Sequence, residues 1–378
     1  MKIVIASDSF KGSLSSIEVA TAAERGIKAV FPDCEVVRVN VADGGEGTME
    51  AIVEALNGEI TTTIVSDPLG RPITAHYGIA DDTAIIEMAK ANGLPLLRPE
   101  ERNPWLTSTR GTGEMIMDAI QRGCQHFLVG IGGSATNDAG TGMLQALGFR
   151  FYDAQNKEIT DCCGGRLQDI ARIDDSHVPT SVQQSQFIVA CDVDTPFCGP
   201  NGAAPVFAPQ KGADANMVAR LDAGMASLAR VIEHTYHIHI APIAGTGTAG
   251  GMGGAFYAFL NATLQRGIEM VLDAIHFDQI IQHADLIITG EGKIDFQTAK
   301  GKTAAGVLTR GKLQHIPVVA IGGCVEMCDS IEQMGFVGIY PILEKQVPLE
   351  IAMQPDFTAT NIERTVKKIL SHPLHFTP

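Results

Sequence analysis

Glycines and carboxylates recur together in this chain where apolar runs end. The clearest case is GIGGSATNDAGTG at residues 130–142, which follows the apolar run HFLVG and has five glycines in thirteen positions. Glycine has no Cβ and reaches positive φ, so a glycine cluster after a strand lets backbone N–H groups approach a ligand such as phosphate. A tight turn would use the same residues. If the pattern recurs elsewhere in the chain, the ligand-binding interpretation is favoured over an isolated turn.

Five further glycine-rich segments repeat the pattern. They are SDSFKGSLSS at 7–16, ADGGEGT at 42–48, GTGTAGGMGG at 245–254, TGEGKIDFQTAKGKT at 289–303 and IGGC at 321–324. Most follow an apolar run, and they place Asp, Glu, Lys, Ser or Thr beside the glycines. Open α/β sheets bind ligands at such strand ends, so we expect a shared ligand crevice.

The charged residues of these segments suit phosphate chemistry. Lys11, between Phe10 and Gly12, offers an ammonium to a phosphate or carboxylate. Carboxylates at strand ends suit Mg²⁺ ligation or orientation of a hydroxyl nucleophile; they are Asp43, Glu46, Asp138, Asp192, Asp194, Glu291 and Asp295. Helix capping explains any one of them alone. As a set, with the lysine and the backbone donors, they predict a kinase site.

Two named nucleotide motifs fail. GTGTAG at 245–250 fits G-x-G-x-x-G, but a proline interrupts the preceding run, and Glu269, near the required spacing, ends no visible strand. This weakens a dehydrogenase interpretation. AKGKT at 299–303 imitates the end of a Walker A sequence, yet Phe296 stands where that motif needs glycine. A conventional P-loop is therefore not predicted.

Composition narrows the class of protein. Among 378 residues, 45% are hydrophobic and 19% charged, which is typical of a globular chain. The 28 Lys and Arg against 43 Asp and Glu give a net charge of −15, so nucleic acid and anionic membranes are not expected partners. The N-terminus reads as a strand and the eight cysteines have no metal or disulfide spacing. We expect a cytoplasmic protein with reduced thiols.

Apolar runs alternate with helical segments, which predicts an α/β fold with a largely parallel sheet. The expected strands cover residues 2–7, 35–41, 83–89, 126–132, 186–193, 285–290, 317–323 and 336–343. The expected helices cover residues 15–31, 48–56, 113–122, 213–235 and 358–370. The chain length favours two or three domains, and the long loops near the middle indicate a binding surface or an irregular second domain.

Six ordered motifs resemble the signatures of the type I glycerate kinase family. They are DSFKGSLSS, ADGGEGT, DPLGRP, GIGGSATNDAGTG, CDVDTPFCGPNGAA with FAPQKGA, and TGEGKID with its following QT and GK. Together they span residues 2 to about 342. The resemblance is to bacterial glycerate kinases of the glycolate and sugar-diacid degradation routes.

The resemblance implies ATP-dependent phosphorylation of D-glycerate with Mg²⁺, giving 2-phosphoglycerate. It also implies two α/β domains with a cleft between them. The expected boundaries give a discontinuous Rossmann-like domain at 1–80 plus 280–378, with a mainly parallel sheet, and an inserted second α/β domain at 81–279. The oligomeric state stays open, a homo-oligomer among the alternatives.

Residue roles follow from the chemistry above and are hypotheses. Lys11 and Arg71 are candidates for the glycerate carboxylate or the transferred phosphoryl group, and Asp192 for orienting or deprotonating the attacking hydroxyl. Asp192 and Asp295 are the metal candidates. The predicted substrate- and phosphate-binding set is Ser9, Lys11, Gly44, Gly45, Glu46, Arg71, Gly132, Gly133, Ser134, Asn137, Asp138, Gly247, Gly250, Gly251, Glu291 and Asp295.

Other functions are compatible with the same residues. A kinase acting at the 3-hydroxyl, or on another small hydroxy acid, would differ only in which oxygen lies in line with the phosphoryl group. A non-catalytic sensor of glycerate or nucleotide is the alternative from a different class.

Overall fold

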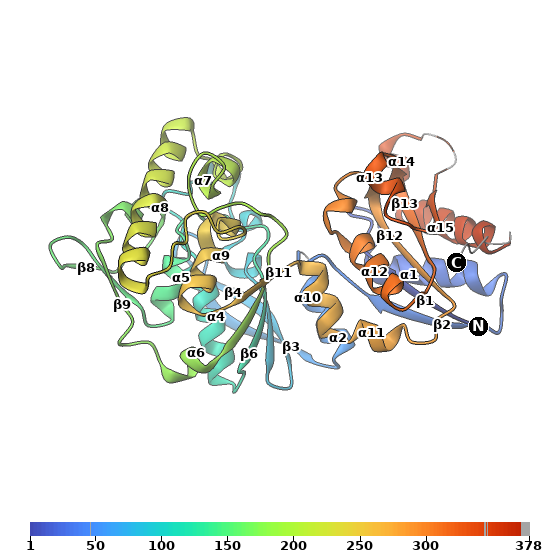
Figure 1. Ribbon diagram of the computed structural model, residues 1–378, viewed down its shortest axis with the longest axis horizontal. Helices are drawn as coiled ribbons and strands as arrows, with labels where there is room; N and C mark the ends of the chain where they lie inside the picture. The colour runs from blue at the N-terminus through green and yellow to red at the C-terminus, as the bar shows by residue number, and fades with distance from the viewer. Residues whose placement is uncertain (46, 344, 346, 372–378) are drawn as a thin grey trace. The chain divides into compact units, whose positions relative to one another are not determined.

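The computed structural model describes residues 1–45, 47–343, 345 and 347–371, which form two compact units (Figure 1). Unit 1 comprises Met1–Asp43 and Val271–Pro378, and unit 2 comprises Gly44–Met270. The division therefore comes at residues 43 and 271, where the sequence analysis placed it at 80 and 280. The first boundary moves because the strands between residues 59 and 80 pair within the sheet of unit 2.

Unit 1 is built on one parallel sheet with the strand order β14-β13-β12-β1-β2. Its strands are β1 (Lys2–Ser7), β2 (Glu35–Asn40), β12 (Leu286–Ile294), β13 (Val318–Val325) and β14 (Gly338–Pro341). Ile3, Val4 and Ile5 are all fully buried. A strand buried on both faces requires such a continuous apolar run, and the predicted parallel sheet is confirmed.

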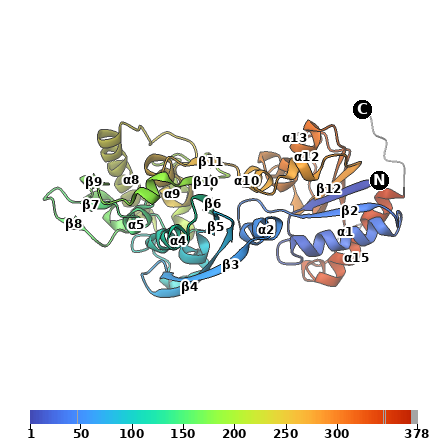
Figure 2. The ribbon, with the colours of Figure 1, turned by 90° about the horizontal axis from the view of Figure 1, so that it is seen from below.

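Helices cover both faces of this sheet. The helices of unit 1 are α1 (Ser16–Lys28), α11 (Phe277–Ile280), α12 (Thr303–Leu313), α13 (Asp329–Glu332), α14 (Leu349–Ala352) and α15 (Pro355–Leu370). Helices α1 and α15 pack together on one face, and α12 and α13 lie on the other (Figure 2). Right-handed crossovers place helices on opposite faces when the chain winds away from the middle of a sheet in both directions.

Unit 2 contains a six-stranded sheet with the order β11-β10-β6-β5-β4-β3. Its strands are β3 (Glu59–Ser66), β4 (Pro72–Ala80), β5 (Thr83–Glu87), β6 (His126–Gly130), β10 (Gln186–Ala190) and β11 (Thr263–Gln265). Strands β5, β6, β10 and β11 are parallel, and β3 and β4 form an antiparallel edge. A separate antiparallel sheet contains β7 (Arg150–Tyr152), β8 (Glu158–Ile159) and β9 (Arg172–Asp174).

The helices of unit 2 surround the larger sheet and its apolar core. They are α2 (Thr48–Ala55), α3 (Ala89–Asn92), α4 (Arg110–Gln121), α5 (Thr141–Ala146), α6 (Thr180–Gln184), α7 (Ala203–Phe207), α8 (Ala215–Tyr236) and α9 (Thr248–Phe259). Helix α10 (Gly267–Ala274) crosses the division between the units. No helix in the described part of the chain is long and apolar enough to cross a membrane. None of the eight cysteines forms a disulfide.

Two glycine-rich segments of unit 2 pack directly on each other. Gly250 has φ +70°, and a Cβ there would lie 2.2 Å from the Thr136 carbonyl oxygen. The Ala139 amide donates to the Gly250 carbonyl at 3.0 Å. The glycine at 250 is therefore required by a close backbone approach between residues 136–139 and the start of α9.

We predict that Gly250→Ala lowers the free energy of unfolding by about 2–5 kcal/mol, because left-handed strain and a steric clash add. Gly123→Ala is the matched control, since Gly123 also has positive φ but nothing within 4 Å of its added Cβ. It should cost only about 1–2 kcal/mol. Urea unfolding measures both, and equal losses would contradict the packing requirement.

Candidate functional site

Topology fixes where a ligand can enter unit 1. From β1 the chain passes to β2 on one side, and from β12 it passes to β13 and β14 on the other. The two connections diverge at the carboxyl ends of β1 and β12, where open α/β sheets bind ligands. A cavity of about 680 Å³ opens there, bordered by residues that end or follow β1, β12, β13 and β14.

Strand register brings two carboxylates to this cavity. Ser7 pairs with Gly290, so the next residue of each adjacent strand segment, Asp8 directly after β1 and Glu291 within β12, reaches the same edge. Asp8 is buried, and its carboxylate accepts from the Ser9 amide at 2.7 Å and the Thr303 hydroxyl at 3.1 Å. Burial raises the pKa of Asp8, and the nearby Asp43 charge raises it further.

Glu291 is the second buried acid of the cavity. Only 6% of the residue is exposed, and Oε1 accepts from the Thr298 hydroxyl at 2.5 Å. Burial raises the pKa of Glu291 to about 7, with Asp8 and Asp295 adding in the same direction. A shift this large at a cavity wall is typical of a functional carboxylate.

Lysines stand beside these acids. Lys11 Nζ lies 3.9 Å from Asp43 Oδ2, and Lys302 Nζ lies 4.0 Å from Glu291 Oε2. Both lysines line the cavity. The wall therefore carries ammonium groups that can meet a phosphate and carboxylates that can meet a cation.

Asp295, predicted as a metal ligand, lies just beyond that wall. Its Oδ2 is 3.2 Å from Lys293 Nζ, and its Oδ1 accepts from the Gln297 amide at 2.9 Å. Burial opposes ionisation of Asp295, but the amide and the ammonium outweigh it and lower the pKa. The carboxylate is thus already held by local partners.

The segment before α12 has the shape of a phosphate-binding turn. Gly301 has φ +102°, Lys302 precedes the helix, and Thr303 begins it. The first amides of a helix have no intrahelical acceptor and favour anions. Sequence reasoning discounted this GKT because the complete Walker motif fails, and it did not select Lys302 or Asp8. The GKT sequence itself was the available signal for Lys302.

Unit 2 gathers a second group of predicted residues at the carboxyl edge of its parallel strands. A Cβ on Gly44 would lie 2.8 Å from the Ala190 Cβ, and one on Gly132 would lie 3.9 Å from the Gly45 Cα. Asp192 follows β10, and its Oδ1 accepts from the Gly267 amide at 2.8 Å. Gly44, Gly45, Gly132 and Asp192 thus border one edge.

Other predicted residues of unit 2 are enclosed. Asn137 and Asp138 are 0% exposed, and the Asp138 carboxylate accepts from the Thr109 amide and hydroxyl, both at 2.8 Å. Gly247, Gly250 and Gly251 are also buried. Only Gly132 and Gly133 of the 130–142 segment are exposed. These residues are enclosed in this structure, and their contact with phosphate stays a prediction.

Lys211, which the sequence analysis did not select, fixes that turn. It is 1% exposed, and its Nζ donates to the Ser134 hydroxyl at 2.7 Å and to the Thr136 carbonyl at 2.6 Å. Burial lowers the pKa of this ammonium to about 7. Ser134, predicted to bind phosphate, is engaged by Lys211. The FAPQKGA stretch contained this lysine.

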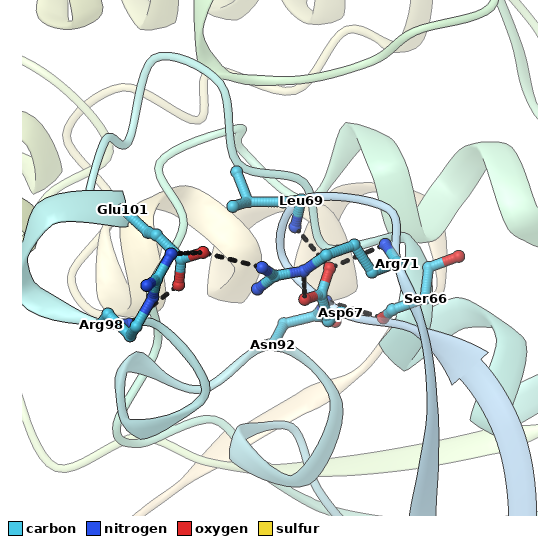
Figure 3. A network of polar contacts seen from close by, with 7 residues as sticks. All are labelled: Ser66, Asp67, Leu69, Arg71, Asn92, Arg98 and Glu101. Carbon is cyan, nitrogen blue, oxygen red and sulfur yellow. Dashed lines mark hydrogen bonds and ion pairs between the residues drawn. The ribbon is translucent and has the colours of Figure 1, made fainter.

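Arg71 lies in a network of ion pairs in unit 2 (Figure 3). Its Nε is 2.5 Å from Asp67 Oδ2, and one terminal nitrogen is 2.8 Å from Glu101 Oε1. The guanidinium is therefore already matched by two carboxylates. Glu46, another predicted site residue, lies outside the described residues.

Comparisons with known proteins identify relatives over nearly the whole length. Residues 3–372 match the Glycerate kinase family. The glycerate kinase of Bacillus subtilis (strain 168) is 46% identical, with 98% of this chain and 97% of that protein covered. The glycerate 2-kinase of Escherichia coli (strain K12) is 45% identical, with 91% of each chain covered. A crystal structure from Salmonella typhimurium LT2, assigned as a glycerate kinase 2, has a TM-score of 0.88 at 43% identity, covering 98% and 97% of the two chains.

We predict that Glu291 makes the stability of unit 1 fall with rising pH in metal-free buffer. Its pKa is raised to about 7 from 4.5, so the folded chain keeps a proton that the unfolded chain loses, and stability declines as pH passes from the lower to the higher value. We compare the free energy of local unfolding around β12 in the wild type with that in the Glu291→Gln variant. The wild-type value should drop by roughly 2–3 kcal/mol more than the variant's between pH 5 and 8.

Hydrogen exchange of the β12 amides measures this difference, with both proteins compared at each pH so that intrinsic exchange rates cancel. Thr298→Val should steepen the decline, because the hydroxyl stabilises the ionised acid. If the free-energy difference between the wild type and the Glu291→Gln variant does not change between pH 5 and 8, Glu291 does not titrate with a raised pKa in the folded protein.

Proposed function

The chain belongs to the glycerate kinase family, and from that premise we propose that it transfers the γ-phosphoryl group of ATP to the 2-hydroxyl of D-glycerate. Membership makes it a phosphotransferase. The observation that supports this assignment most directly is the cavity of unit 1, where lysines and carboxylates meet at the carboxyl ends of β1 and β12. The name of the Escherichia coli relative supports the 2-hydroxyl.

Phosphoryl transfer needs groups that position phosphates and offset their charge. Lys11 and Lys302 would meet phosphate oxygens, together with the first amides of α12. Ser9 follows Asp8 directly, and its amide is held by that carboxylate at 2.7 Å. This contact holds the backbone two residues before Lys11.

Mg²⁺ in kinases is held by one or two carboxylates together with phosphate oxygens. Across the described ranges, no three His, Cys, Asp or Glu side chains form a metal site of their own, so a protein-only cage is not proposed. Asp8, Asp43 and Glu291 supply hard oxygen donors whose mutual repulsion a cation relieves. We propose Asp8 and Glu291 as its ligands. Asp295 and Asp192, the candidates chosen from the sequence, remain alternative ligands. When bound, the cation offsets phosphate charge.

In unit 2, the exposed turn at Gly132 and Gly133 would present backbone amides to the acceptor or the transferred group. Asp192, exposed at the end of β10, would orient or deprotonate the glycerate hydroxyl. We also propose that Arg71 binds the carboxylate of glycerate, which requires the substrate to displace Asp67 or Glu101 from the guanidinium. The pathway we propose is glycolate or sugar-diacid catabolism.

The reaction product tests the function and its alternatives. Purified protein with ATP, Mg²⁺ and D-glycerate should give 2-phosphoglycerate by ³¹P and ¹H NMR, with L-glycerate, glycolate and tartronate as competing acids. A 3-phosphoglycerate signal would move the reaction to the other hydroxyl, and a different preferred acid would change the substrate. If ATP is not consumed with any of these acids, the kinase assignment fails and the non-catalytic sensor becomes the favoured alternative.

Two substitutions test the assigned roles. Lys11→Ala should lower kcat/KM by about 100-fold or more, and Asp192→Asn should lower kcat by a similar factor, because each removes charge that acts during transfer. Lys157→Ala, an exposed lysine near β8, is the control. Folding is checked by circular dichroism and unfolding midpoint. A folded variant with near-normal rates would remove that residue from the site.

A further inference from the structure

We propose that the unit 1 cavity is the nucleotide site, with the base on an apolar wall formed after β14 and the triphosphate at the lysine-bearing end. The chemical class is a nucleoside triphosphate. This assignment rests on the proposed function and assigns ATP to one of the two units.

The size of the cavity favours a ligand larger than glycerate. At about 680 Å³, it lies in the range of roughly 300–1,000 Å³ that holds drug-sized ligands and cofactors. Glycerate has three carbons and oxygen on each of them. A cavity of this size would leave such a molecule mostly surrounded by water, whereas a nucleotide would contact both walls.

One wall is apolar, and it is built from elements near the C-terminus. Ile342 and Leu343 follow β14, and Ala352 and Met353 come from α14 and the residue after it; all four line the cavity. Met353 lies over the loop between β1 and α1, since a Cβ on Gly12 would be 2.5 Å from its terminal methyl. Apolar side chains gain nothing from a hydroxy acid, but they stabilise a heteroaromatic ring through burial and dispersion.

The cavity also carries the charge that a triphosphate needs. Lys11, Lys293 and Lys302 line it together with Asp8, Asp43 and Glu291. The first turn of α12 begins beside this group, since Thr303 donates to Asp8 at 3.1 Å. Helix amides with lysines form the usual phosphate cradle, and carboxylates next to it suit the cation that accompanies ATP.

The chain offers adjacent positions for a controlled test. Ala352 lines the cavity, whereas its neighbour Ile351 is 40% exposed and does not. Ala352→Trp should fill the apolar wall and weaken binding of the non-hydrolysable analogue AMP-PNP with Mg²⁺ at least tenfold by calorimetry. Ile351→Trp places the same ring on the same helix and should leave that Kd unchanged.

A second readout uses no cavity-filling variant. Met353 is one of 13 methionines, and its methyl signal is assigned by Met353→Leu in protein labelled with ¹³C-methyl methionine. AMP-PNP should shift this signal in the wild type, whereas inorganic tripolyphosphate should shift it much less, because it lacks the base.

The outcomes separate this inference from the proposed function. If the wild type phosphorylates glycerate while Ala352→Trp binds AMP-PNP normally and the Met353 signal stays still, the nucleotide site is elsewhere and the kinase assignment stands. If the wild type binds AMP-PNP with the Met353 shift but phosphorylates no acid, the nucleotide site stands and the kinase assignment fails. Equal weakening by both tryptophan variants would overturn the apolar wall as the base site.

Discussion

Parallel pairing of β1 with β12 is the interaction on which the candidate site depends. It joins the two sequence segments of unit 1, and the register of Ser7 with Gly290 sets Asp8 beside Glu291. The whole of unit 2 lies between these strands in sequence. Because the entropy of closing a loop grows only slowly with its length, such an insertion costs little once unit 2 folds by itself. The acidic pair is therefore a consequence of sheet register.

The sequence predicted the parallel strands because apolar runs buried on both faces have few alternatives. It missed β3 and β4, because Thr, His, Gly and Pro interrupt their apolar residues and β3 exposes Ile60 and Ile64, so neither strand reads as a continuous apolar run. It also could not separate two uses of glycine. Gly132 and Gly133 are exposed, whereas Gly250 allows a close backbone approach. Absence of a Cβ serves both purposes, so only the long-range packing partner decides.

Charge posed the same difficulty, since a charged side chain in a motif reveals nothing of its partner. Arg71 and Asp138 were predicted to meet ligand, yet each is engaged within unit 2. Lys211 was overlooked, although its buried ammonium holds Ser134 and the Thr136 carbonyl. Burying an ammonium is costly unless its donors are satisfied. Here those bonds fix the turn that exposes Gly132 and Gly133, so the lysine acts through the backbone.

In the proposed reaction, a chain with a net charge of −15 attracts two anionic substrates, and the charged groups of the unit 1 cavity offer one way to reconcile these charges. Burial and the charges of neighbouring acids raise the pKa of Asp8 and Glu291, so the ionised acids are costly when no cation is near. A bare acid such as glycerate adds to that repulsion. A nucleotide arriving with its own divalent cation relieves it, and the lysines then meet the remaining phosphate charge. In the proposed arrangement, the carboxylates whose ionisation costs free energy without a cation therefore favour binding of a metal–nucleotide complex over binding of a simple anion.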